Sequence, residues 1–230
     1  MSVKKAPAKR PLAPRPRPVN AVTRVKICGL TSLDDCLRAI DAGADALGFN
    51  FYPKSPRYLS LGKAATIIAK LPPFVSTVSV WVDPSVGQLR ESLGACRWSA
   101  IQLSGDESDD LALSFPADLV IRAARLKDKR ALSGVLQKPR CAAWLVDAAV
   151  PGSFGGTGKT ARWDLAASLA EQRRVILAGG LTPQNVAQAV RTVRPYGVDT
   201  ASGVEKAPGR KDGAKMRAFV KEATQAGAGS

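Results

Sequence analysis

Residues 25–51 read VKICGLTSLDDCLRAIDAGADALGFNF, and this stretch decides the fold. Two short apolar runs, 25–28 and 46–51, predict strands, and the residues between them are apolar at helical spacing over 33–42. A strand, a helix and a second strand form a βαβ unit, in which the two strands lie parallel. The fold then depends on how often this unit recurs.

The same alternation continues to the end of the chain. Further strands are predicted at 75–82, 100–103, 119–123, 142–147, 175–178 and 197–200, and further helices at 61–71, 85–93, 108–113, 130–136, 165–170, 183–193 and 211–223. Pro183 after Thr182 is typical of a helix start. Eight βα units in about 200 residues predict a single (β/α)₈ barrel. A doubly wound open sheet is the alternative, but no Gly-x-Gly-x-x-Gly opens the first helix.

Composition indicates a globular chain with two polar ends. Hydrophobic residues make up 45% of the 230 residues and charged residues 23%, which is ordinary globular usage. The longest apolar run has about six residues, whereas a membrane helix needs about 18. We therefore expect a (β/α)₈ barrel domain over 23–225, a disordered Pro/Lys/Arg-rich extension over 1–22 and a frayed end over 226–230.

Cysteine and histidine usage narrow the chemistry. The four cysteines are scattered without a CxxC pair, which argues against a disulfide scaffold and favours a reducing cytoplasm. Histidine is absent, so a Ser-His-Asp triad, an imidazole base and a histidine metal ligand are all excluded. No metal site is predicted.

The net charge of +15 has two parts. The first 24 residues hold seven cations and no acid, so residues 25–230 still carry +8. A basic body fits an anionic substrate. The extension alone allows a second hypothesis, a nucleic-acid-binding protein with an inactive barrel, although no aromatic residue lies in the extension to stack on bases.

Reactive groups of a barrel are expected where its strands end. Lys26 and Cys28 share one face of the first strand, and a nearby ammonium lowers a thiol pKa toward neutrality, so Cys28 is a candidate base or nucleophile. Arg57, in the loop after the second strand, can hold a carboxylate with two hydrogen bonds. Asp147 ends the sixth strand, where partial desolvation raises a carboxyl pKa and suits a proton donor.

Three glycine-containing loops follow the later strands. Residues 152–160 hold a Gly158-Lys159-Thr160 sequence, but the spacing of a nucleotide P-loop is not met, and a mobile flap is the better interpretation. Gly179-Gly180 follows the seventh strand and Ser202-Gly203 the eighth. Loops seven and eight are where barrels bind phosphate, so together they predict a phosphate site.

With these residues in place, the chain resembles the phosphoribosylanthranilate isomerase family over about 200 residues. The matching pieces are Lys26-Ile27-Cys28-Gly29, Gly43-Ala44-Asp45-Ala46, Gly48-Phe49, Tyr52 through Arg57, Gln102-Leu103, Asp147 with Gly155 through Gly158, Ala178 through Leu181, Asp199, Ser202 through Glu205, and Pro208-Gly209. The opening piece and the Ser-Gly-Val-Glu piece are specific when found together in this order. The N-terminal extension lies outside the resemblance.

The resemblance implies a cytoplasmic enzyme of tryptophan biosynthesis, monomeric or homodimeric, without a cofactor or metal. Its reaction is the Amadori rearrangement of N-(5-phosphoribosyl)anthranilate. Asp147 is then the general acid, Cys28 the general base and Arg57 the anchor of the anthranilate carboxylate. The remaining substrate-binding residues that it implies are Gln102, Gly179, Gly180, Asp199, Ser202 and Gly203.

One departure and two related families bear on this expectation. Ser104 stands after Gln102-Leu103, where the family commonly has histidine, and serine carries no charge near neutral pH. Two other sugar-phosphate-binding barrel enzymes are alternatives with the same fold. An indole-glycerol-phosphate synthase would be expected to use lysine and glutamate at the strand ends, and Cys28 with Asp147 argues against it. A histidine-pathway isomerase would pair two aspartates, and Cys28 stands where the first of them would be.

Overall fold

The eight apolar runs form eight parallel strands in the computed structural model, which describes residues 22–147 and 163–228. They are β1 (Arg24–Cys28), β2 (Ala46–Asn50), β3 (Ser76–Trp81), β4 (Ala100–Leu103), β5 (Val120–Ala124), β6 (Ala143–Asp147), β7 (Val175–Ala178) and β8 (Gly197–Thr200). Neighbours in sequence pair along the sheet, and β8 pairs with β1 through Lys26↔Asp199 and its adjacent residues. The sheet therefore closes into a barrel.

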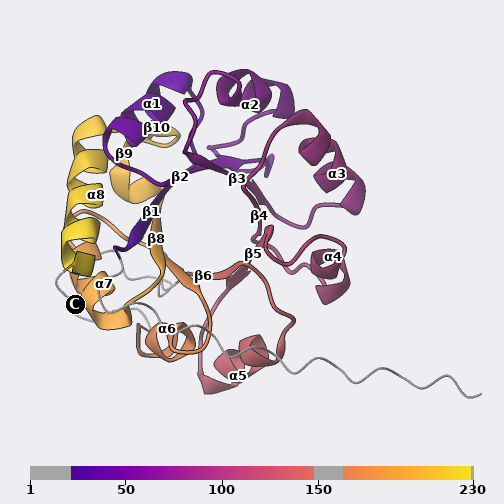
Figure 1. Ribbon diagram of the computed structural model, residues 1–230, viewed down its shortest axis with the longest axis vertical. Helices are drawn as coiled ribbons and strands as arrows, with labels where there is room; N and C mark the ends of the chain where they lie inside the picture. The colour runs from indigo at the N-terminus through magenta and orange to yellow at the C-terminus, as the bar shows by residue number, and fades with distance from the viewer. Residues whose placement is uncertain (1–21, 148–162, 229–230) are drawn as a thin grey trace, which may run out of the picture.

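Within the described residues, eight α-helices surround the strands (Figure 1). They are α1 (Leu33–Asp41), α2 (Leu61–Ile68), α3 (Val86–Ala95), α4 (Asp109–Leu113), α5 (Lys129–Gln137), α6 (Trp163–Ala170), α7 (Val186–Val193) and α8 (Gly213–Ala228). Each follows its strand in the order β, α, β, as the sequence predicts. The predicted (β/α)₈ barrel is confirmed.

Polar side chains explain where several helices begin. The Ser32 hydroxyl accepts a hydrogen bond from the Asp35 N–H at the start of α1. At α3, Ser85 and Gln88 each accept the other's backbone N–H, which forms a capping box. Such caps satisfy N–H groups that have no partner inside the helix, and each typically contributes about 1 kcal/mol. These local signals fix helix starts close to their predicted places.

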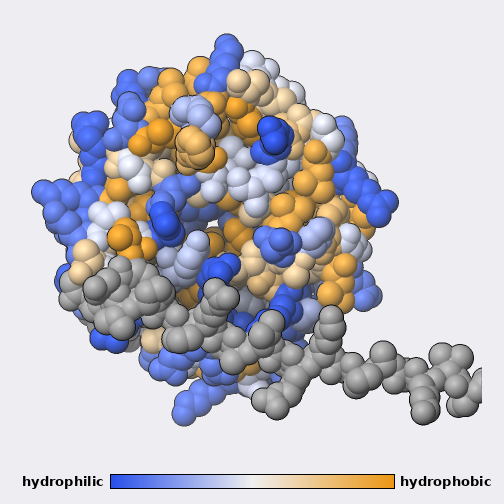
Figure 2. Space-filling view, in the orientation of Figure 1, coloured by the Kyte–Doolittle hydropathy of each residue, from blue (hydrophilic) through white to orange (hydrophobic). Residues whose placement is uncertain are grey.

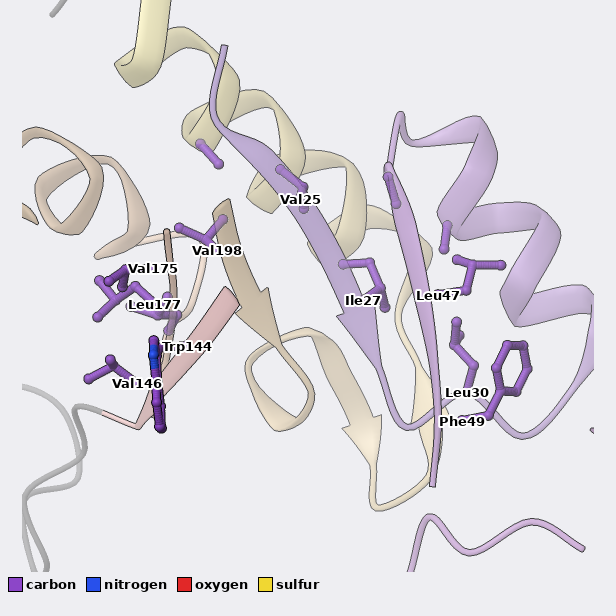
Figure 3. Close-up of a cluster of buried hydrophobic side chains, with 14 of the residues drawn as sticks. Val25, Ile27, Leu30, Leu47, Phe49, Trp144, Val146, Val175, Leu177 and Val198 are labelled. Carbon is purple, nitrogen blue, oxygen red and sulfur yellow. The ribbon is translucent and has the colours of Figure 1, made fainter. Parts of the chain in front are cut away.

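Apolar side chains form two layers, one on each side of the barrel wall. Val25 and Ile27 of β1 face the helices within the larger cluster, as Figure 3 shows together with Leu47 of β2. A smaller cluster, which includes Cys28 and Ala178, fills the inside of the barrel. Successive side chains of a strand alternate between these layers. Lys26 and Cys28 therefore share the inner face, as predicted.

Two predicted helix starts are wrong. The helix after β7 begins at Val186 instead of Pro183, because the Asn185 side chain bonds back to the Thr182 N–H and the Gly180 carbonyl and so holds residues 182–185 as a turn. The last helix begins at Gly213, because Lys211 belongs to a strand.

That strand is part of a hairpin that the sequence pattern does not predict. After β8 the chain makes a short 3₁₀ helix, η1 (Ser202–Val204), and then β9 (Glu205–Ala207) pairs antiparallel with β10 (Arg210–Lys211). Strands of two and three residues are too short to show an alternating pattern. The hairpin is described further below because it reaches the mouth of the barrel.

The chain ends differ in part from expectation. Helix α8 continues to Ala228, and Gly227 packs so closely against Thr23 that a side chain would not fit there. The frayed end expected from residue 226 is therefore wrong for residues 226–228. Most of the predicted extension, and residues 229–230, lie outside the described part. No helix within 22–147 or 163–228 is long and apolar enough to cross a membrane.

Candidate active site

The carboxyl ends of the strands surround a cavity of about 340 Å³. On the face drawn in Figure 2, hydrophilic residues surround the centre of the ring. Of the predicted site residues, the cavity is lined by Gln102, Asp147, Gly179, Gly180, Asp199 and Ser202. Cys28, Arg57 and Gly203 do not line it. Residues from β4, β6, β7 and β8 thus meet in one place, although they are far apart in sequence.

Lys26 and Asp199 form an ion pair inside the barrel. The Lys26 Nζ donates to Asp199 Oδ1 over 2.6 Å, and both side chains are buried. Burial opposes the charge of Lys26, but Asp199 and Cys28 outweigh it, so the pKa of Lys26 lies above its ordinary value. The lysine therefore stays charged at neutral pH and its charge is balanced locally.

Cys28 lies beside this pair and is almost fully buried. Burial raises the pKa of its thiol, and Lys26 lowers it only in part because Asp199 acts in the opposite direction. The net pKa lies above the ordinary value, so the predicted shift toward neutrality is wrong. The sequence pattern placed an ammonium near the thiol but did not indicate how deeply the thiol is buried, which is the larger cause of the shift, or the Asp199 carboxylate beside it.

Arg57 lies over the end of β1, next to Cys28. Its long side chain crosses Gly29, whose φ of +72° favours glycine and where a Cβ would clash with the Arg57 Cδ. Arg57 Nε donates to Glu205 Oε1 over 2.8 Å and Nη2 donates to Oε2 over 2.6 Å. We expected the Arg57 guanidinium to hold a substrate carboxylate, and one of its edges is thus already paired with Glu205.

Glu205 is shared by a second cation. Lys211, fully buried, donates from Nζ to Glu205 Oε1 over 2.8 Å. Burial alone would raise the pKa of Glu205, but hydrogen bonds from Arg57 and Lys211 outweigh it and hold the pKa below its usual range. Glu205 is therefore ionised, and the two basic side chains around it give a formal surplus of one positive charge, although burial lowers the pKa of Lys211 below its ordinary value against the opposing effect of Glu205.

Asp147 is exposed at the end of β6, so the partial desolvation expected from its apolar strand is wrong. The strand itself is buried up to Val146, and Leu145 and Asp147 are its residues that line the cavity. The predicted glycine-rich flap over 152–160 lies outside the described residues. The carboxyl is thus accessible to a ligand from the cavity.

The loops after β7 and β8 are held together at their bases. Thr200 Oγ1 donates to the Leu181 carbonyl over 2.8 Å, and a Cβ at Gly203 would clash with that same carbonyl. Gly203 is therefore required for the close approach of the two loops. Gly179, Gly180 and Ser202 stand on the cavity side of this contact. Their backbone N–H groups supply the kind of donors that bind phosphate.

Gln102 carries an unused acceptor in the cavity. The residue is buried, its Nε2 donates to Ser104 Oγ over 3.0 Å, and its Oε1 accepts no hydrogen bond from the residues the structure describes. A buried polar atom without a partner costs free energy until a ligand satisfies it. Gln102 is thus suited to accept from a substrate N–H or hydroxyl.

Three residues of the site were missed. Glu205 was quoted in the resemblance without a role, Lys211 was assigned to a helix, and Arg125, the cation among the described cavity-lining residues, lies just beyond β5. Only Arg125 carried a usable signal, since it is a charge directly after an apolar strand. Within the described ranges, no group of three or more Cys, Asp or Glu is arranged to hold a metal ion.

We expect Asp199→Asn to destabilise the barrel strongly. The change leaves the buried Lys26 ammonium without its counter-charge, which costs roughly 3–5 kcal/mol when one partner of a buried pair is removed. Urea unfolding measures this free energy. Asp45→Asn is the matched control, because it breaks the more exposed Arg24–Asp45 pair and should cost about 1 kcal/mol or less. Equal losses in both variants would show that the inner pair has no special weight.

Comparisons with known proteins agree on one family. The family model for N-(5'-phosphoribosyl)anthranilate isomerase matches residues 25–222. A protein of that name from Geobacter metallireducens is 48% identical over 202 residues, covering 88% of this chain and 99% of the relative. A crystal structure of phosphoribosyl anthranilate isomerase from Thermotoga maritima is 39% identical with a TM-score of 0.79, covering 88% and 99%.

A further solved structure contains a ligand. It is a phosphoribosyl anthranilate isomerase in complex with reduced 1-(o-carboxyphenylamino)-1-deoxyribulose 5-phosphate, 36% identical with a TM-score of 0.77. It covers 88% of this chain and 99% of its own. The family model covers all eight strands except Arg24, the first residue of β1, and it ends within α8.

Proposed function

This chain belongs to the N-(5'-phosphoribosyl)anthranilate isomerase family, and we propose that Cys28 and Asp147 divide the proton transfers of its reaction between them. The enzyme is an isomerase of tryptophan biosynthesis that acts on a small-molecule substrate. It carries out the Amadori rearrangement of N-(5'-phosphoribosyl)anthranilate to the 1-deoxyribulose 5-phosphate product. The observation that carries the assignment of roles is that the parallel strands β1 and β6 of the closed barrel end at the same mouth, where residues of β6, β7 and β8 line the cavity.

Asp147 is the general acid in this proposal. Its carboxyl donates a proton to the furanose ring oxygen, the bond between that oxygen and C1 breaks, and the nitrogen lone pair forms the C1=N bond of an open-chain Schiff base. An exposed side chain at the end of β6 supports this role because the sugar ring must approach the acid from the cavity.

Cys28 is the general base. Its thiolate removes the proton from C2, and the electrons of that C–H bond form a C1=C2 double bond while the nitrogen is neutralised. The resulting enolamine gains a proton at C1 and loses the one on its C2 hydroxyl, which gives the ketone. No oxidant or reductant is needed, because hydrogen only moves between adjacent carbons and oxygen.

The environment of Cys28 makes this thiolate scarce but basic. Its raised pKa means that most molecules carry the thiol at neutral pH, whereas a thiolate that does form binds a proton strongly. Lys26, Lys211 and Arg57 are the cations that act on it, and Asp199 is the opposing anion. Deprotonation therefore requires a pH above the ordinary thiol range or help from bound substrate.

The two anionic ends of the substrate have separate partners. We propose that Arg57 binds the anthranilate carboxylate through the edge of its guanidinium that Glu205 does not occupy. The main chain at Gly179-Gly180 and Ser202-Gly203 holds the phosphate, while Gln102 and Asp199 contact the sugar between them. The excess positive charge of residues 25–230 favours such a doubly anionic ligand.

Assembly and location are parts of the same proposal. The free thiols of Cys28, Cys36, Cys96 and Cys141 suit a reducing cytoplasm. A monomer or a homodimer is proposed, since one solved relative is described as mutually generated monomers of the dimeric isomerase from Thermotoga maritima. A nucleic-acid role is the alternative for the basic extension, and it predicts DNA binding that falls steeply with salt and is lost when residues 1–22 are deleted.

Turnover of phosphoribosylanthranilate, followed through the loss of its anthranilate fluorescence, tests the function directly. Arg57→Ala is expected to raise KM by about tenfold or more while kcat falls less, because an anchor lost in both ground and transition state weakens binding uniformly. Lys54→Ala is the control, a neighbouring exposed cation of the same loop. A fall in kcat alone would place Arg57 in the chemical step instead.

A further inference from the structure

A hairpin behind the mouth of the barrel holds Glu205 where three donors reach it. Arg57 donates twice, Lys211 donates through Nζ, and the Gly209 N–H donates to the same carboxylate over 3.3 Å. Only 5% of the Glu205 side chain is exposed. A carboxylate buried this deeply is fixed in one orientation, so the arginine that it grips is fixed as well.

Lys211 ties the same carboxylate to the loop after β8. Its Nζ also donates to the Ala201 carbonyl over 3.0 Å, directly before Ser202 and Gly203. Its own backbone N–H donates to Asp35 Oδ2, which anchors the hairpin on α1. The lysine therefore spans the space between the proposed phosphate loop and the Glu205–Arg57 pair.

This arrangement has a charge balance that suits an anion. Two cations share one carboxylate, so the group as a whole keeps one positive charge near Cys28. Removing two cations and one acid from water is costly, and replacing them with apolar residues would often stabilise a fold just as well. The presence of these three charged side chains at the mouth of the barrel is explained if they help to bind an anionic ligand.

We propose that Glu205 and Lys211 are positioning residues that hold Arg57 at a fixed distance from the loop after β8, and thereby set the spacing between the carboxylate and phosphate anchors. They do not touch substrate; they act through Arg57 and Ala201. This inference rests on the proposed function, because it takes Arg57 as the carboxylate anchor. It makes the hairpin a determinant of which bis-anionic ligands fit.

The experiment compares two inhibitors in four proteins. The first inhibitor is reduced 1-(o-carboxyphenylamino)-1-deoxyribulose 5-phosphate, and the second is its phenylamino counterpart without the carboxyl group. Their inhibition constants are measured with the wild type, Arg57→Ala, Glu205→Gln and Asp45→Asn. Glu205→Gln is expected to weaken the carboxylated inhibitor by about 10- to 100-fold and to leave the other unchanged. The KM for substrate should rise in parallel, with a smaller change in kcat.

Asp45→Asn is the matched control, since it makes the same chemical change in an ion pair before β2, at the other end of the barrel. It should behave as the wild type. Because Glu205→Gln unpairs the buried Lys211, Glu205→Asp is the second variant. It keeps the charge but is one methylene too short to reach Arg57 and Lys211 together, so an intermediate loss is expected.

The outcomes separate the two claims. The carboxylate preference is the ratio of the inhibition constants of the two inhibitors. Its loss in both Arg57→Ala and Glu205→Gln supports the inference. Loss in Arg57→Ala with full preference in Glu205→Gln overturns it and leaves the proposed function intact. If Glu205→Gln does not fold, Glu205→Asp decides instead: a preference for the carboxylated inhibitor equal to that of the wild type overturns the inference. Full preference in Arg57→Ala overturns the role of Arg57 and the inference together.

Discussion

Replacing Cys28 with alanine is expected to lower kcat by about 10²- to 10⁴-fold, the usual contribution of a positioned acid or base. The side chain is the proposed base for the C2 proton, and alanine leaves no group in its place. KM should change little, because the thiol does not hold either anionic end of the substrate. Steady-state turnover with the fluorescent substrate measures both constants.

The dependence of kcat/KM on pH tests whether Cys28 acts as a thiolate. The wild-type profile also depends on the proposed acid, so the base is tested in Asp147→Asn. The residual turnover of that variant depends on the Cys28 thiolate, and because burial raises the pKa of this thiol, its kcat/KM should still be rising above about pH 8.5, the ordinary thiol value. A substrate deuterated at C2 should react more slowly in the wild type if the proton transfer is rate-limiting. A profile of Asp147→Asn that is flat from pH 6 to 9 would contradict the proposed base.

Cys36→Ala is the matched control for Cys28→Ala. Cys36 is fully buried in α1, and burial raises the pKa of its thiol to about 12, but it lies in the outer apolar layer. Its removal should affect stability and leave kcat unchanged. If Cys28→Ala turned over like Cys36→Ala, the proton would have to leave C2 by another route.

Replacing Asp147 with asparagine is expected to lower kcat by a similar factor, about 10²- to 10⁴-fold. The amide has nearly the same shape and still lines the cavity, but it cannot donate a proton to the ring oxygen. Binding of the reduced product analogue, whose ring is already open, should be almost unchanged. Comparing turnover with analogue binding separates the chemical step from recognition.

Asp118→Asn serves as the control for this change. Asp118 is an exposed carboxyl just before β5, at the opposite end of the barrel from Asp147. Activity should be that of the wild type. A normal rate in Asp147→Asn would assign the protonation of the ring oxygen to another donor, and would leave the exposed position of Asp147 without a role in the reaction.

Much of the barrel follows from local pattern. The strands predicted at 100–103, 175–178 and 197–200 are observed as β4, β7 and β8 with the same bounds, and the other five differ by at most one residue at either end. A period of two in strands and of 3.6 in helices is written into adjacent residues, and caps such as Ser85 are local too. The predictions that are wrong lie where other contacts compete with the local sequence pattern.

Two such places illustrate the limit. Thr182-Pro183 has the form of a helix start, yet Asn185 uses its side chain to bind the loop after β7, and the helix begins later. Lys211 fits a helical pattern, yet it pairs in the β9–β10 hairpin and is buried against Glu205. At Asn185 a side chain close in sequence holds a turn, and the Lys211 N–H also bonds to Asp35, 176 positions away. In both places a specific contact, and not the periodic pattern, determined the backbone.

The sequence by itself determined the eight βα units, the inward face shared by Lys26 and Cys28, and the glycines that follow β7 and β8. Only the tertiary structure decided the electrostatics. Asp199 reaches Lys26 from 173 positions away, and Glu205 reaches Arg57 from 148 positions away. The pKa of Cys28 and the free edge of Arg57 depend on burial and on such distant charges, because Coulomb interactions and desolvation are set by separation in space and not by separation along the chain.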